Sequence, residues 1–184
     1  MSKRALILLA DGFEEIEAIA VIDILRRAEI KVAITSLDFK LVASARKMMI
    51  KTDYLIETLP DYEFDMLVLP GGSEGVKNLE ESEGAKSLIR RFEAEGKYVA
   101  AICAAPLILE HMGFLKGKKA TSYPGIAAEL KSCEYQANST VVVDGKLITS
   151  QGPATAIEFA LTLVEVLKSK EARTAIETAI IYKG

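Results

Sequence analysis

The amino-acid sequence predicts an α/β fold in which helices cover both faces of a mostly parallel central sheet. Continuous apolar runs at residues 5–10 and 66–69 are typical of strands that are buried on both faces. Other stretches, such as residues 14–28, repeat their apolar positions with the period of a helix. Strands and helices that alternate along one chain favour a parallel sheet. The chain has 184 residues and half are hydrophobic, so we expect residues 1–184 to form a single domain.

The remaining elements follow in order along the chain. Further strands are expected at residues 31–36, in a short β excursion at 39–45 and 48–54, and in a run that ends at Ile102. A turn at Asp144 and Gly145 predicts a hairpin between residues 141–143 and 146–149. Helices are expected at residues 82–95, 106–111, 153–167 and 171–180. Gly113 is placed to end the helix before it. Residues 117–138 look irregular, with a short helix after Pro124.

Composition limits the classes of partner and compartment. The formal net charge is −3 and the pI is near 5.4, so nothing suggests binding to nucleic acid. Two cysteines do not make a disulfide framework, which favours a reducing cytoplasm. The chain begins without the pattern of a signal peptide. Its longest apolar run, residues 99–109, is shorter than the roughly 20 residues that a membrane span requires. We therefore expect a soluble cytoplasmic protein without a membrane partner.

Cys103 lies where the strand ends at Ile102 and a helix begins near Pro106, because proline suits the first helical turn. A thiol on such a turn lies close to the free N–H groups and the positive dipole end of the helix. These surroundings favour a thiolate, so we expect a lowered pKa for the Cys103 thiol and a nucleophilic role. The alternative is a small buried residue without a chemical role.

Glu17 heads the apolar stripe of the first helix, whose other members are Ala20, Val21, Ile24 and Ala28. Glu15 is expected on the polar side of the same helix. Burial raises the pKa of a carboxyl group, so Glu17 is expected to hold a proton near neutral pH and to donate a hydrogen bond to an anion. The alternative is a glutamate that only complements the helix dipole.

Gly71 and Gly72 follow a buried strand and permit close approach of the backbone. Their N–H groups are candidates for an anion-binding nest or an oxyanion hole, and a purely structural turn is the alternative. The spacing of the glycines matches neither common phosphate-binding pattern. In a parallel sheet the turns at residues 11–17, 70–75 and 103–106 would share the edge where ligands bind.

The single histidine, His111, cannot pair with Cys103 on this pattern. A helical offset of eight residues is about 12 Å, whereas a Cys–His pair requires roughly 3 Å. We expect His111 to have a structural role near a helix C-terminus. One histidine and two separated cysteines also do not form a zinc site, so neither a metal nor a cofactor is expected.

Several motifs together resemble the ThiJ/PfpI superfamily, and most closely its Parkinson-disease-associated deglycase (DJ-one) branch. They are residues 3–17, 68–72, 78–79, 100–106 and 148–153. The resemblance implies a flavodoxin-like sandwich, a homodimer and a nucleophile-elbow cysteine at Cys103. It also implies a protonated Glu17 and an oxyanion hole formed by the amides of Gly72 and Ala104. The activities that it implies are glutathione-independent glyoxalase, deglycase, and protection or chaperoning in oxidative stress.

The chain departs from the pattern of this superfamily near the candidate site. Tyr123 occupies the position of a site histidine, and a phenol is a poor base at neutral pH. Gln151 stands where an arginine often precedes the Gly-Pro pair. Arg46 matches an arginine near the dimer seam, whereas Cys133 matches no site residue. The missing histidine argues against peptidase activity.

Two functions therefore remain open on the sequence, together with a third that has less support. The leading hypothesis is an enzyme that acts on reactive carbonyls or glycated substrates, with Cys103 as nucleophile and Glu17 as proton shuttle. Gly71, Gly72, Ala104 and Tyr123 would bind the substrate or its oxyanion. The alternative is a redox sensor or chaperone, in which Cys103 is oxidised to a sulfinate without substrate turnover. A cysteine peptidase is the third possibility.

Overall fold

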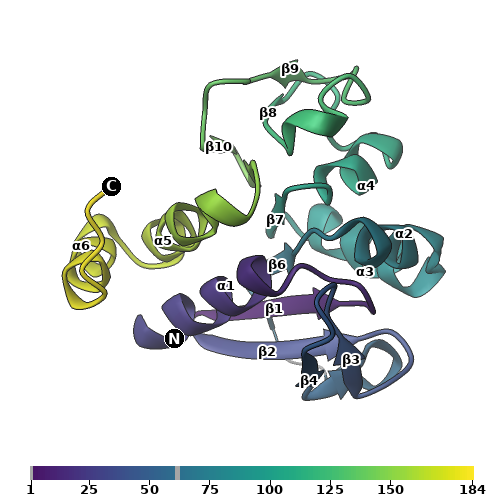
Figure 1. The fold of residues 1–184 in the computed structure, drawn as a ribbon, viewed down its shortest axis with the longest axis horizontal. Helices are drawn as coiled ribbons and strands as arrows, with labels where there is room; N and C mark the ends of the chain where they lie inside the picture. The colour runs from purple at the N-terminus through teal and green to yellow at the C-terminus, as the bar shows by residue number, and fades with distance from the viewer. Residues whose placement is uncertain (1, 61–62) are drawn as a thin grey trace.

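A parallel sheet forms the centre of the structure, a computed structural model that describes residues 2–60 and 63–184 (Figure 1). Over these residues the sheet has seven strands in the order β10-β11-β7-β6-β1-β2-β5. Only β10 is antiparallel to its neighbour. The strands are β1 (Arg4–Leu9), β2 (Lys31–Ser36), β5 (Tyr54–Leu55), β6 (Met66–Leu69), β7 (Tyr98–Ile102), β10 (Val141–Asp144) and β11 (Leu147–Ser150).

Helices cover both faces of this sheet and bury two hydrophobic cores. One core joins α1 and α5 to alternate residues of the strands, such as Ile7 and Val68. The other core joins α2, α3 and α4 to the residues between them, such as Leu8 and Leu67. The two sets of helices lie on opposite sides in Figure 1. The helices are α1 (Glu15–Arg27), α2 (Ser73–Glu81), α3 (Glu83–Ala94), α4 (Pro106–His111), α5 (Ala156–Leu167) and α6 (Lys170–Ala179).

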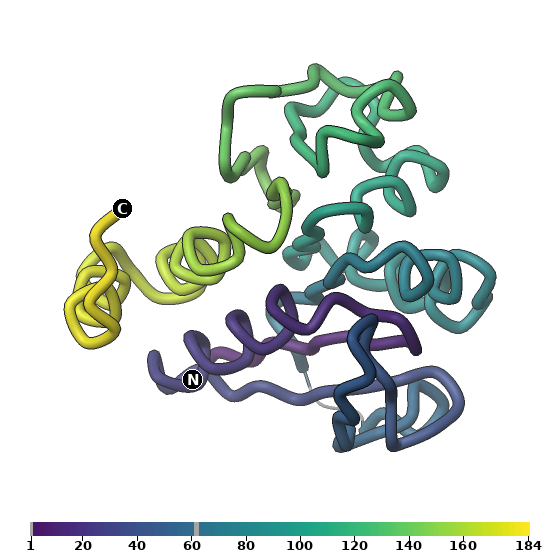
Figure 2. The backbone as a smooth tube through the Cα atoms, viewed as in Figure 1, coloured from purple at the N-terminus to yellow at the C-terminus, as the bar shows by residue number. Residues whose placement is uncertain are grey.

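The C-terminal helix α6 packs on α5 at the edge of the molecule (Figure 2). Arg173 ties the two helices together, because its guanidinium binds Glu158 of α5 at 2.7 Å and Glu177 of α6 at 2.7 Å. Tyr182 extends this contact, since its hydroxyl donates to the other oxygen of Glu158 at 2.9 Å. The chain end is therefore held by polar contacts around one cation.

The fold confirms the predicted three-layer α/β sandwich and most of its elements. The β excursion forms a separate hairpin of β3 (Leu41–Ala43) and β4 (Met49–Lys51). The irregular region contains a small sheet of β8 (Lys119–Ala120) and β9 (Glu134–Tyr135), and the short helix predicted after Pro124 is present there as Pro124–Ile126. The sequence did not predict these two strands, nor helix α2.

The predicted position of Glu15 on a solvated face is wrong. Glu15 is only 8% exposed, and its Oε2 has no hydrogen-bond partner among the described residues. The β3–β4 hairpin lies beside the loop that leads into α1, because Phe13 and Ser44 form a β-bridge and Ala45 N–H donates to the Phe13 carbonyl. The hairpin therefore packs beside the start of α1, a contact that the helical period of α1 does not reveal.

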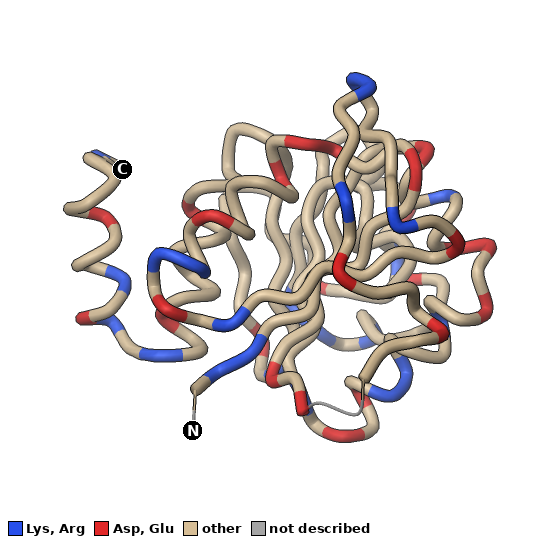
Figure 3. Tube along the Cα trace, turned by 90° about the horizontal axis from the view of Figure 1, so that it is seen from below, with Lys and Arg blue, Asp and Glu red and all other residues tan. Residues whose placement is uncertain are grey.

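Charged residues of both signs are interspersed along the chain (Figure 3). Ion pairs such as Lys3–Asp65 and Arg27–Asp23 link neighbouring segments, both at 2.7 Å. Within the described residues, every helix is too short or too polar to cross a membrane.

Candidate active site

The predicted turns meet at one edge of the sheet. Strands β1, β6 and β7 are neighbours, so the loops after their carboxyl ends lie side by side. Strand β11 pairs with β7 on the other side and adds residues 150–152 to this edge. A ligand-binding position at the carboxyl ends of the strands is the usual one for an open α/β sheet.

Cys103 occupies a strained turn between β7 and α4. Its φ angle is +64°, in the left-handed region that residues other than glycine rarely adopt. Two backbone hydrogen bonds hold the turn, since Cys103 N–H donates to the Ser150 carbonyl at 3.0 Å and the Cys103 carbonyl accepts from Tyr123 N–H at 2.8 Å. This backbone presents a half-buried thiol at the edge of the sheet, as in a nucleophile elbow.

Glu17 lies directly beside the Cys103 thiol. Its side chain is fully buried, its Oε2 accepts the Gly71 N–H at 2.7 Å, and the carboxyl group hydrogen-bonds with the thiol. Gly71 permits this approach, because a Cβ there would lie 2.6 Å from Cys103 Cβ and 2.7 Å from Glu17 Oε2. The structure therefore brings the predicted acid, the predicted nucleophile and one of the predicted glycines into contact.

The electrostatics of Glu17 confirm the predicted shift. Burial raises the pKa of its carboxyl group to about 7, and the charge of Glu14 adds to that effect. Hydrogen bonds with Gly71 and Cys103 act in the opposite direction. Oε1 is buried without a conventional donor in the described part of the chain, which favours a proton on the carboxyl group. Glu17 therefore gains or loses its proton near neutral pH.

The prediction of a lowered pKa for the Cys103 thiol is wrong. Burial raises the pKa of the thiol to about 12, and the negative charge of Glu17 and the hydrogen bond to it contribute further. Hydrogen bonds from the amides of Ala104 and Gly72 act against this rise but do not overcome it. Above pH 7 the carboxyl and the thiol hold one proton between them. The thiol and the carboxyl group therefore titrate as a pair, and the helix dipole alone does not ionise the sulfur.

The amides of Gly72 and Ala104 both lie at helix N-termini beside the sulfur. Gly72 caps α2 with a φ angle of +95°, and a Cβ there would lie 2.2 Å from the Gly12 carbonyl. Ala104 precedes Ala105, which is the N-cap of α4. Both amides donate toward Cys103. Two N–H groups that converge on one sulfur can also stabilise an oxyanion on a carbon bound to it.

Tyr123 also lies near the thiol. A Cβ at Gly152 would lie 3.7 Å from Tyr123 Cδ2 and 4.0 Å from Cys103 Sγ. The Tyr123 side chain is half-exposed. The sequence singled out the Gly-Pro motif but did not place Gly152 at the site. The only signal in the sequence was a glycine two residues after a strand. That signal becomes informative once β11 is known to lie beside β7.

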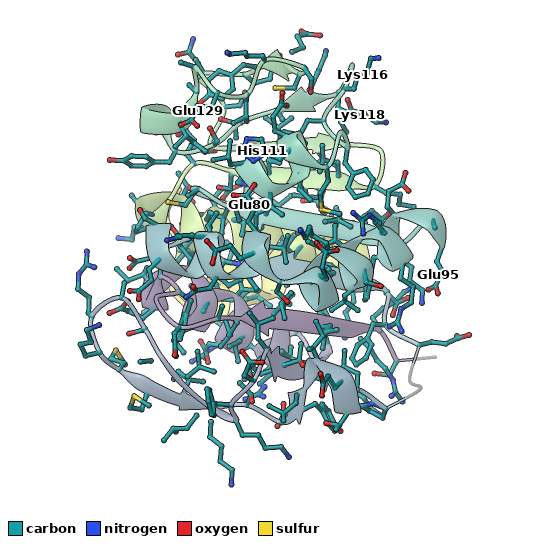
Figure 4. The ribbon with its side chains drawn as sticks, turned by 90° about the vertical axis from the view of Figure 1, so that its right-hand side faces the viewer. Glu80, Glu95, His111, Lys116, Lys118 and Glu129 are labelled. Atoms are coloured by element: carbon teal, nitrogen blue, oxygen red, sulfur yellow. The ribbon has the colours of Figure 1, made fainter. Side chains whose placement is uncertain are left out.

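Three other candidate residues have different surroundings. His111 Nδ1 pairs with Glu80, which joins α4 to α2 on the surface (Figure 4). The Gln151 amide donates to the Ala137 carbonyl at 2.9 Å. Arg46 is exposed at the turn of the β3–β4 hairpin. The pairing of His111 agrees with the structural role expected for it.

Comparison with known proteins places this site in a family. A family model described as the DJ-1/PfpI family matches residues 3–166. The chain belongs to the DJ-1/PfpI family. Protein dj-1beta of Drosophila melanogaster is 44% identical over 173 residues, which cover 93% of this chain and 92% of that protein. Deglycase PH1704 of Pyrococcus horikoshii is 34% identical over 166 residues, which cover 90% of this chain and 99% of the relative.

Solved DJ-1 structures have the same fold. The crystal structure of Drosophila melanogaster DJ-1beta matches with a TM-score of 0.96 at 41% identity, over 100% of both chains. Oxidized Toxoplasma gondii DJ-1 matches with a TM-score of 0.94 at 36% identity, also over 100% of both chains. Membership in the DJ-1/PfpI family and its flavodoxin-like fold agree with the resemblance seen in the sequence motifs.

Proposed function

We propose that this member of the DJ-1/PfpI family is a cofactor-independent cysteine enzyme that acts on reactive carbonyl compounds. It would convert methylglyoxal to lactate and release related adducts from glycated proteins or nucleotides. The observation that carries this proposal is the contact between Cys103 and Glu17, a nucleophile and a proton carrier with a pKa of about 7. The name of the Pyrococcus relative, a deglycase, supports the same substrate class.

The first step forms a hemithioacetal. Sγ of Cys103 attacks the aldehyde carbon, so a sulfur–carbon bond forms while the carbonyl π bond breaks. The thiol proton passes to the Glu17 carboxylate and from there to the new alkoxide. Because Glu17 titrates near neutral pH, it is matched to this transfer in both directions. The amides of Gly72 and Ala104 stabilise the negative oxygen before the proton arrives.

The second step is an internal oxidation and reduction. Glu17 removes the proton from the carbon bound to sulfur and returns it to the neighbouring carbon through an enediol. The first carbon thereby becomes a thioester, while the ketone becomes an alcohol. Water then cleaves the sulfur–carbon bond, lactate leaves, and Cys103 regains its proton. The sum is methylglyoxal plus water to lactate, so no external oxidant or reductant is required.

Deglycation applies the same groups to an adduct that is already attached to an amine. An aminocarbinol carries the two-carbon unit that the first step recognises, and Cys103 would displace the amine from it. The resulting hemithioacetal then follows the same path to lactate. The free amine of the protein or nucleotide is restored.

We further propose that the protein acts as a homodimer in the cytoplasm. Large apolar side chains of α1 and of the β3–β4 hairpin are exposed on the single chain, namely Ile16, Ile19, Met48 and Met49. Exposed apolar groups on adjoining elements are typical of a surface that a partner covers. Light scattering of the purified protein measures the mass, and a monomer at micromolar concentration would contradict this part of the proposal.

The alternative function, a redox sensor or chaperone, has one specific observation in its favour. The half-buried sulfur of Cys103 lies among two amide donors and a carboxyl group that holds a proton near neutral pH, and these groups can hold the oxygens of a sulfinate. Two peroxide molecules would oxidise the thiol to the sulfinic acid and leave two waters. A mass gain of two oxygens without any carbonyl turnover would favour this function over the enzyme.

The decisive experiment measures lactate formation from methylglyoxal. The wild type is compared with Cys103→Ser and Glu17→Gln, and Cys133→Ser serves as a control cysteine variant. Cys103→Ser should fall to the background rate, and Glu17→Gln should lose about a hundredfold to ten-thousandfold in rate because the proton carrier is absent. Cys133 packs against the core of α2, α3 and α4 and donates to the Leu130 carbonyl at 3.8 Å, so its variant should keep the wild-type rate. Equal rates in all four proteins would overturn the proposal.

A further inference from the structure

We infer that Tyr123 determines substrate specificity, because its ring forms an aromatic wall beside Cys103. The wall favours α-oxoaldehydes that carry a planar aromatic group over those that carry a methyl group. This inference rests on the proposed function, since it concerns substrates that bind to the same sulfur. It goes beyond that function because it names the shape of the preferred substituent.

Two glycines leave room for the ring. A Cβ at Gly125 would lie 2.9 Å from Tyr123 Cε1 and 3.2 Å from Cδ1, which form one edge of the ring. A Cβ at Gly152 would lie 3.7 Å from Cδ2, on the opposite edge. The ring therefore lies between two positions that lack side chains. At Gly125 any side chain would force it to move, because contacts below 3.0 Å are too close for carbon atoms.

The same glycine connects the ring to the sulfur. The Cβ position at Gly152 is also 4.0 Å from Cys103 Sγ, so the ring edge and the thiol both border the space above Gly152. Tyr123 remains 50% exposed, which leaves part of the ring open to a bound molecule. A group carried by a carbon attached to Sγ would therefore enter the space that the ring borders.

Hydrogen bonds hold the backbone on both sides of this ring. Tyr123 N–H donates to the Cys103 carbonyl at 2.8 Å, which ties the base of the side chain to the elbow itself. The Tyr135 hydroxyl donates to the carbonyl of Ser122 at 3.2 Å. On the other side, Thr155 Oγ1 accepts the Gly152 N–H at 3.0 Å. A surface that is ordered before binding loses little entropy when a substrate packs on it.

An aromatic substituent gains most from such a surface. Two rings attract each other when their centres lie roughly 4.5–7 Å apart, in offset or edge-on arrangements. A methyl group is too small to cover the ring. We expect the ratio of kcat/KM for phenylglyoxal to kcat/KM for methylglyoxal to be about fivefold higher with the Tyr123 ring than without it, which is the size of one aromatic contact.

The test compares kcat/KM for phenylglyoxal, which yields mandelate, with kcat/KM for methylglyoxal, which yields lactate. Tyr123→Phe keeps the ring and should hold the ratio within about twofold, whereas Tyr123→Leu should lower it by about fivefold. Gly125→Ala should also lower the ratio, because the added methyl displaces an unaltered tyrosine. Gly84→Ala is the matched control, since the nearest neighbour of a Cβ there would be at 3.6 Å, an ordinary van der Waals contact. An unchanged ratio in both Tyr123→Leu and Gly125→Ala would overturn the inference.

A second measurement separates this inference from the proposed function. Cys103 is alkylated with N-phenyliodoacetamide and with iodoacetamide, and the two rates are compared by mass spectrometry. The rate with N-phenyliodoacetamide divided by the rate with iodoacetamide should be lower in Tyr123→Leu and Gly125→Ala than in the wild type. If this ratio falls but the wild type turns over neither aldehyde, the proposed function is rejected and the inference about Tyr123 is retained. If the wild type turns over both aldehydes but the ratio of alkylation rates is the same in the wild type and the variants, only the inference about Tyr123 is rejected.

Discussion

Replacing Glu17 with glutamine should make the protein more stable at alkaline pH. The carboxyl group is fully buried and its pKa is raised from 4.5 to about 7. The folded chain therefore binds this proton more tightly than the unfolded chain, and the unfolding free energy falls as the pH rises through this interval. This rise in pKa stabilises the folded chain by about 3 kcal/mol at low pH, and that stabilisation is lost above pH 7. Glutamine has no charge to bury, and it can still accept the Gly71 N–H.

Urea denaturation at pH 5 and pH 8 measures this effect. The difference in unfolding free energy between Glu17→Gln and wild type should grow by about 2.5 kcal/mol from pH 5 to pH 8, the part of the shift that falls in this range. Apart from Cys103, whose pKa depends on the charge of Glu17, the titrating groups behave alike in the two proteins and their contributions cancel. The same difference at both pH values would refute the reasoning, because Glu17 would then titrate like an exposed carboxyl group.

Three more predictions follow from the same contacts. Gly71→Ala should lower kcat/KM about a hundredfold, because the added methyl group overlaps the Cys103 side chain and displaces the reacting groups. An unchanged kcat/KM would contradict this packing. The kcat/KM for methylglyoxal should rise about tenfold per pH unit below pH 7 and level off above it, because Glu17 loses its proton near pH 7. A pH-independent kcat/KM would exclude Glu17 as the base. Arg173→Met should lower the free energy of unfolding by about 2 kcal/mol in urea denaturation and speed hydrogen exchange in α6. Slow exchange in α6 of this variant would show that other contacts hold the helix.

Most of the fold could be predicted because the buried strands are short, apolar and separated by amphipathic helices. Residues 31–36 and 66–69 have the same bounds in the structure as in the prediction. Helix α2 was missed because Gly71, Gly72 and Gly75 surround its start and read as a turn. Only Val76 and Leu79 form its apolar stripe, and two residues are too few to define a helical period.

The site could be predicted only in part. The convergence of Cys103, Glu17 and Gly71 follows from the rule that ligands bind at the carboxyl ends of parallel strands. The pKa of Cys103 could not be predicted, because the sequence does not show that the burial and the charge of Glu17 act on the sulfur. The contact between Tyr123 and Gly125 lies in the irregular region, where no periodicity positions a side chain.

The most direct test of the shared proton is the rate of Cys103 alkylation by iodoacetamide as a function of pH. In wild type the rate should rise with an inflection near pH 7, because loss of the proton from Glu17 lets the thiol pass its own proton to the carboxylate. Glu17→Gln should lack this inflection. A single inflection near pH 8.5 in both proteins, the value of a free cysteine, would show that the two groups titrate independently.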